Sequence, residues 1–112
     1  MPLVKTTQPG SAISVTAASA LLANRFIGFA GTYPTVNTKS LGVTQMAFDS
    51  GEQAAVVIDG IVLLELGGTV AVGGAIITGA NGVGLPHSST HIINAYALEA
   101  GGSGDVIKVK LV

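Results

Sequence analysis

Apolar and polar positions alternate most clearly at the end of the chain. The stretch "KVKLV", residues 108–112, sets Lys108 and Lys110 against Val109 and Leu111. This period of two is typical of a strand with one face in a core and the other in water. No window carries a convincing helical stripe, and glycine interrupts runs of short and β-branched apolar residues every few positions. The pattern therefore predicts an all-β protein.

Two dipeptides mark predicted turns. Asp59-Gly60 divides "AAVVIDGIVLLEL", and Asn81-Gly82 follows "GGAIITGA". Such pairs tolerate the positive φ angles of tight hairpins, so we expect a β-hairpin at each. The best helix candidate is "SVTAASALLANRF", in which Ser14 would cap a short Ala- and Leu-rich helix.

One pattern occurs twice along the chain. Residues 43–58, "VTQMAFDSGEQAAVVI", resemble residues 96–112, "YALEAGGSGDVIKVKLV", and a shift of 53 positions puts Val57 on Lys110. Each copy consists of a strand, a turn of small residues and a second strand. A four-residue insertion extends the match upstream and aligns Phe26 with Ala75.

Two copies of about 50 residues are too few for a solenoid, which needs roughly three or more repeats to bury a continuous core. We therefore expect residues 12–112 to form a single domain, a small β-barrel or β-sandwich built from two pseudo-repeated halves. Closing or stacking the sheets would also protect their edges.

Composition points to a protein that contacts other proteins. Apolar residues make up 48% of the 112-residue chain, whereas charged residues make up 10% and aromatic residues 4%. The core must be assembled from Val, Ile, Leu and Ala, and few charges keep the surface from associating. The net charge is −1 with no Lys/Arg cluster, which argues against nucleic acid or an anionic membrane as a partner.

Candidate catalytic chemistry is sparse. His87 and His91 in "HSSTH" have the spacing that binds zinc from one helix face, but Pro86 and the intervening Ser and Thr residues predict a loop, and the chain has no cysteine. We expect no metal, no cofactor and no enzymatic activity. A small metal-binding barrel enzyme of the cupin type, with the metal at these histidines, is the alternative.

The first residues have no alternation. Residues 1–11, "MPLVKTTQPGS", hold two prolines, and Gln8, Pro9 and Gly10 break the apolar run that a signal peptide needs. This segment is either a frayed terminus or an extended arm that adds to a partner's surface. In the second case, Pro2 and Pro9 limit the entropy lost on binding.

The repeated pattern resembles a known family. The stretches "LGVTQMAFDSGEQAAVVIDG" and "AYALEAGGSGDVIKVKLV" are similar to the small phage head proteins of the capsid cement, or decoration, family. The similarity covers about residues 12–112. Its signature positions here are Leu41, Gly42, Val43 and Gly51 in the first copy, Asp59-Gly60 at the centre, and residues 97–100 and 104–111 at the end.

This resemblance implies a β-barrel-like domain that forms homo-oligomers, trimers in preference to dimers. It also implies a place on the outside of the assembled phage head, after synthesis in the bacterial cytoplasm, with the major capsid protein as partner. A neck or tail component, or a bacterial shell protein, is the other possibility. The expected capsid contacts lie in the arm and are Pro2, Leu3, Val4, Lys5, Gln8 and Pro9.

Overall fold

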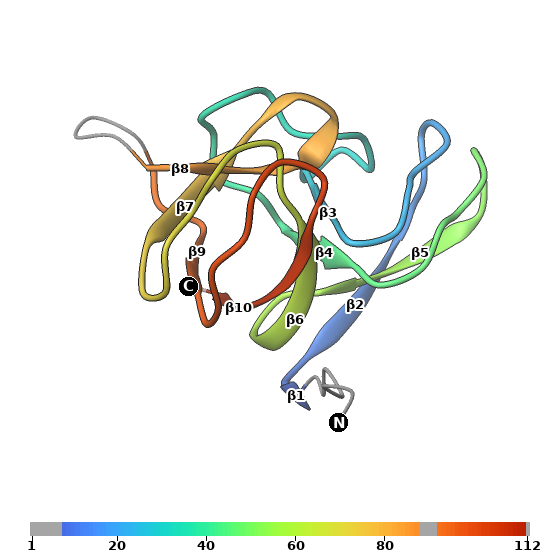
Figure 1. Cartoon of the computed structure of the whole chain (residues 1–112). Coiled ribbons are helices and arrows are strands. Elements are labelled where there is room, and N and C mark those ends of the chain that lie inside the picture. The colour runs from blue at the N-terminus through green and yellow to red at the C-terminus, as the bar shows by residue number, and fades with distance from the viewer. Residues whose placement is uncertain (1–7, 88–91, 112) are drawn as a thin grey trace.

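Two antiparallel β-sheets pack against each other in the computed structural model, which describes residues 8–87 and 92–111 (Figure 1). The only helix in these residues is a single 3-10 turn, Ala80–Gly82. The all-β prediction is therefore confirmed. The sheets do not close into a barrel, so the sandwich is the correct alternative of the two.

The two sheets differ in size. Sheet A has six strands, and sheet B has four. In spatial order, sheet A contains β1 (Gln8–Pro9), β6 (Gly60–Glu65), β10 (Val106–Leu111), β9 (Ala95–Ala97), β7 (Ala75–Thr78) and β8 (Gly84–Pro86). Sheet B contains β2 (Ala12–Thr16), β5 (Gln53–Val57), β4 (Gly42–Thr44) and β3 (Arg25–Ile27).

The predicted repeat appears in the strand order. Sheet B runs β2-β5-β4-β3, and the four central strands of sheet A run β6-β10-β9-β7, so each half places its strands in the same sequence. The register agrees as well. Thr44 pairs with Val56, and Ala97 pairs with Val109, each residue lying 53 positions later.

The connecting turns repeat too. The Gly51 amide donates to the Ala17 carbonyl at 2.7 Å, and the Gly104 amide donates to the Leu66 carbonyl at 2.7 Å. Both glycines have a positive φ, 91° and 88°. The two halves are therefore one structural unit built twice, down to the turn that joins its last two strands.

The cores show how the halves are joined. Phe26, Val43 and Val57 of sheet B are buried in one cluster with residues of sheet A such as Val62 and Val109. One face of sheet B thus packs on the inner face of sheet A. The opposite face of sheet B has a smaller core of its own, formed by Ala17, Leu21, Ile27, Ala54 and Val56.

One of the two predicted hairpins forms. β7 and β8 pair on either side of Asn81 and Gly82, which have φ of 57° and 76°. The hairpin predicted at Asp59-Gly60 is wrong, because β5 and β6 belong to different sheets. Gly60 does adopt a positive φ, 95°, but it serves a crossing between the layers.

The predicted helix is also wrong. Ser14 lies in β2 and caps nothing, and Leu21 forms an antiparallel bridge with Phe48. Ala17 and Leu21 are buried in the smaller core, so burial of these side chains from extended backbone outweighs the helix preference of Ala and Leu. In the described part of the chain, no helix has the length and apolar character needed to cross a membrane.

The duplicated turn generates a stability prediction. A Cβ at Gly51 or Gly104 would meet no atom within 4 Å, so Gly51→Ala and Gly104→Ala add only the strain of a positive φ. We expect each to lower the free energy of unfolding by about 1–2 kcal/mol, equally and additively. Urea denaturation measures this.

Gly42→Ala is the contrasting variant, because its Cβ would overlap the Val57 carbonyl oxygen. It should lose more stability than either turn variant. Clearly different losses at Gly51 and Gly104 would contradict the equivalence of the two turns.

Candidate functional site

The predicted arm enters the described structure as β1. Gln8 and Pro9 pair with Ile61 and Gly60 at the edge of sheet A. An edge position suits Pro9, because proline has no amide hydrogen to donate to a further strand. The other candidate contacts, Pro2, Leu3, Val4 and Lys5, lie outside the described residues.

Asp59 fixes the point where the chain leaves β1. Its carboxylate Oδ1 accepts a hydrogen bond from the Ser11 amide at 2.6 Å, and its carbonyl accepts one from the Gly10 amide at 3.1 Å. A Cβ on Gly10 would overlap this carboxylate, so a larger residue at position 10 would displace the Asp59 side chain from this position. The crossing from β1 to β2 is thereby tied to the crossing from β5 to β6.

Beyond β1, a side chain closes the edge of β6. The Gln45 side-chain amide accepts a hydrogen bond from the Leu63 backbone amide through Oε1 at 3.1 Å, and its Nε2 donates one to the Leu63 carbonyl at 3.0 Å. The Glu65 amide then donates to the Asn24 carbonyl at 2.8 Å. Gln45 thus takes the place of a paired strand, which limits unwanted pairing at this edge.

A hollow of about 240 Å³ lies where the sheets meet. Two polar residues that line it are hydrogen-bonded to each other: the Ser40 hydroxyl and backbone amide both donate to Asn94 Oδ1, at 3.2 and 2.9 Å. An amide oxygen is no base, so this hydroxyl is not activated as a nucleophile. The lining residues are Phe29, Lys39, Ser40, Leu41, Gly42, Ile58, Asn94 and Leu111.

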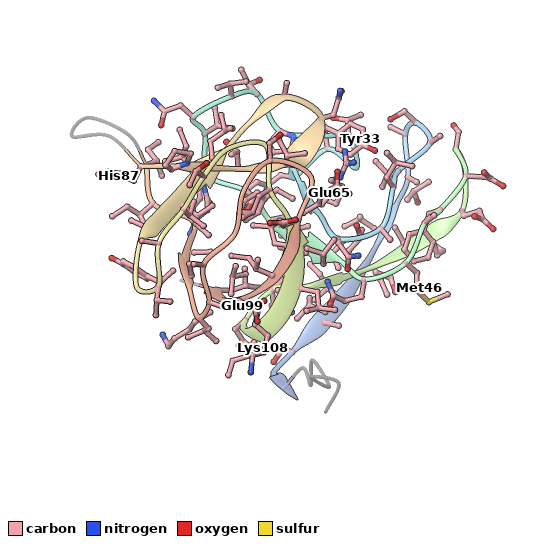
Figure 2. The ribbon with its side chains drawn as sticks, viewed as in Figure 1. Tyr33, Met46, Glu65, His87, Glu99 and Lys108 are labelled. Carbon is pink, nitrogen blue, oxygen red and sulfur yellow. The ribbon has the colours of Figure 1, made fainter. Side chains whose placement is uncertain are left out.

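Titratable groups in the described residues form no catalytic cluster. Glu65 pairs with Arg25 at 3.0 Å, and Arg25 also donates to the Asn81 carbonyl at 3.0 Å, so this ion pair joins β3, β6 and the 3-10 turn. His87 is half-buried at the end of β8 (Figure 2). His91 lies outside the described residues, and within them no three His, Cys, Asp or Glu side chains gather to hold a metal.

The outward face of sheet A carries side chains of a different kind. One row across the strands is Ile61, Lys110, Tyr96 and Ala75, paired in that order. A second row contains Leu63, Lys108 and Leu98. Lys108 pairs with Leu63, and the Lys108 carbonyl accepts a hydrogen bond from the Leu98 amide at 2.9 Å. We call these residues the lysine face: Ile61, Leu63, Tyr96, Leu98, Lys108 and Lys110.

Sequence reasoning found only part of this face. The alternation in "KVKLV" placed Lys108 and Lys110 on a solvated side, and the structure confirms this, with Lys110 exposed and Val109 buried. Leu98 was identified only as part of the family signature at residues 97–100, and Tyr96 was not identified as a surface residue. Aligning the two copies signals Tyr96, because it stands at the position of buried Val43.

The chain belongs to the phage cement protein family, whose sequence profile matches residues 7–111. Among solved structures, the fold is similar to the N base of head fiber gp8.5 of bacteriophage phi29, with a TM-score of 0.78 and 19% sequence identity. The match covers 91% of this chain and 93% of that one. No curated protein sequence matches. The chain is thus a structural protein of the phage head, and the resemblance seen in its sequence is confirmed.

The closed edge of β6 can be tested by mutation. Gln45→Ala removes both hydrogen bonds to Leu63 and leaves a part-buried amide and carbonyl without these partners. We expect the free energy of unfolding to fall by about 1–3 kcal/mol, as measured by urea denaturation.

Met46→Ala is the matched control, because the neighbouring Met46 is 67% exposed and points away from the body (Figure 2). It should leave stability within about 0.5 kcal/mol of the unmodified protein. Equal effects of the two substitutions would show that the Gln45 hydrogen bonds contribute nothing.

Proposed function

We propose that this protein is a capsid decoration protein that binds the outer surface of the assembled phage head and bridges neighbouring major capsid subunits. The observation that carries the proposal is the cement-family match, which extends over residues 7–111 and so over every described strand of both sheets. The similar fold in a head fiber base of phi29 supports attachment to a head rather than to a neck or tail.

The proposed mechanism is stabilisation by mass action. A protein that binds the assembled shell but not dissociated subunits shifts the equilibrium toward the shell, by about 2.7 kcal/mol per site at a concentration 100 times the dissociation constant. No catalytic step is needed. We propose no metal and no cofactor, since Ser40, Asn94 and Glu65 are all engaged in holding the fold.

We further propose that the protein acts as a homo-oligomer, a trimer in preference to a dimer. A trimer that engages several capsid subunits makes its later contacts at high effective concentration, so that weak single contacts give firm attachment. The sparse charge of the chain and its exposed apolar side chains support such contacts; Phe29 and Val72, for example, are 70% and 68% exposed.

The arm is the proposed first contact with the capsid, through Pro2, Leu3, Val4, Lys5, Gln8 and Pro9. Its pairing with β6 and the Asp59 hydrogen bonds support this role, because they fix where the arm begins. An anchored segment loses less entropy on binding than a free peptide.

Heads provide the direct test of the function. Purified heads that lack this protein should bind it to a saturable stoichiometry in co-sedimentation, and bound heads should release their DNA at a temperature several degrees higher, because binding stabilises only the intact shell. Light scattering measures the oligomeric state of the added protein. Heads that neither bind it nor change their release temperature would refute the proposal.

The arm is tested by deleting residues 2–7, which leaves β1 and the Asp59 hydrogen bonds in place. The expected result is an unchanged unfolding midpoint with affinity for heads reduced at least tenfold, or about 1.4 kcal/mol. Met46→Ala serves again as the control that should bind normally. Undiminished binding after the deletion would exclude the arm as a contact.

A further inference from the structure

The lysine face lies on a side of the duplicated unit that is buried in the first half and faces outward in the second. In sheet B, Phe26, Val43 and Val57 occupy this side and are buried against sheet A. Their counterparts in sheet A are Ala75, Tyr96 and Lys110, which pair with one another in the same way. The same sheet surface is therefore an internal interface in the first half and an outer surface in the second.

Two of these three positions change in the same way, whereas Phe26 is replaced by the small residue Ala75. Valine becomes tyrosine at position 96 and lysine at position 110, and both are side chains with an apolar body and a polar tip. Tyr96 and Leu98 are each 39% exposed. Tyrosine surrounded by apolar area is enriched at protein interfaces.

The charge of the face restricts its partner. Both charged side chains in its two rows are lysines, Lys108 and Lys110. Among the acids that border these strands, Glu65 pairs with Arg25, Asp59 accepts from Ser11, and Asp105 accepts from Gly102. Glu99 directly follows Leu98 at the end of the second row, so the face carries two lysines beside one bordering carboxylate and its charge is positive on balance. The face therefore complements a surface that presents carboxylates around an apolar patch.

A two-fold pairing of this face with a second copy is disfavoured. In such a contact the same patch is present on both sides, so each copy would bring the same two lysines to the interface. Like charges that face each other across a contact are destabilising. The face suits a different protein better than a copy of itself.

The face is also continuous with the arm. β1 pairs with β6 at Ile61, which begins the row that continues through Lys110 to Tyr96. The described part of the arm, β1, therefore lies next to the lysine face. Arm and face would engage the same partner.

We infer that the lysine face is the surface that docks on the assembled head, against an acidic and partly apolar patch of the shell. This inference rests on the proposed function and adds the surface and the partner chemistry to it. The lysines supply salt-dependent attraction, and Tyr96, Leu98 and Ile61 supply the apolar contact.

The test uses the full chain and heads that lack it. The double variant Lys108→Gln/Lys110→Gln should bind at least tenfold more weakly at low salt, with a flatter dependence of affinity on salt. Tyr96→Ala should also weaken binding, but leave the salt dependence as it is. Lys110→Arg should bind normally, because it keeps the charge.

The matched control is Ser14→Glu/Ser50→Glu, which changes the net charge equally at exposed sites in and beside sheet B. It should bind as the unmodified protein does. Weakening equal to that of the lysine variant would overturn the inference, because net charge alone would explain the loss.

Two further outcomes separate the possibilities. Undiminished binding by the lysine variant, with normal binding by the unmodified protein, would overturn the inference and leave the proposed function standing. A change of oligomeric state in light scattering would identify the face as a self-contact and overturn it as well. Failure of the unmodified protein to bind heads would refute the proposed function itself.

Discussion

The structure depends on the packing of one sheet face against another at Phe26, Val43 and Val57. A chain with 4% aromatic residues has few large side chains with which to build a core, and Phe26 is the largest one that is fully buried. Placing it between the sheets lets the aliphatic residues of both halves share a single cluster. Apolar area removed from water contributes about 25 cal/mol per Å², so one shared core stabilises the fold more than two separate small ones. The second core, around Leu21 and Ile27, is smaller because loops rather than a sheet cover it.

This packing also explains the asymmetry of the two halves. Each half has the same strand order and register, so the same sheet face exists in both halves. In the first half this face, with Phe26, Val43 and Val57, is buried against sheet A. In the second half it faces outward, where valine at the equivalent positions would leave an apolar patch of the kind that associates without specificity. Tyr96 and Lys110 instead combine an apolar body with a polar tip, which is the chemistry expected of a surface that binds a specific partner.

Much of the fold could be predicted from the sequence because the internal repeat is a more direct guide to structure than the secondary-structure propensities of single residues. The match of residues 43–58 to residues 96–112 predicted the strand-turn-strand unit, and the register of Thr44 and Ala97 confirms it. The turn signal at Asp59-Gly60 gave a wrong prediction because the same backbone geometry occurs in two kinds of connection. A positive φ at Gly60 fits a hairpin and a crossing between sheets equally well, and only the pairing of distant strands distinguishes them. Only part of the lysine face could be predicted from the sequence. Alternation shows which residues of one strand are solvated, but not which strands lie beside it.

The proposed attachment to the head, through the arm and the lysine face, is a sum of modest contacts. Two lysines in a partly solvated face provide attraction that salt screens within about 10 Å, which is too weak alone for lasting attachment. An arm of a few apolar residues is also weak when it binds as a free peptide. Because the Asp59 hydrogen bonds fix the start of the arm beside the row that contains Lys110, binding of one element holds the other near its own site. The second contact then forms at an effective concentration set by a short tether, and the affinities combine. The strand pairing of sheet A holds the residues of the face in fixed register, so less free energy is lost in ordering them on binding.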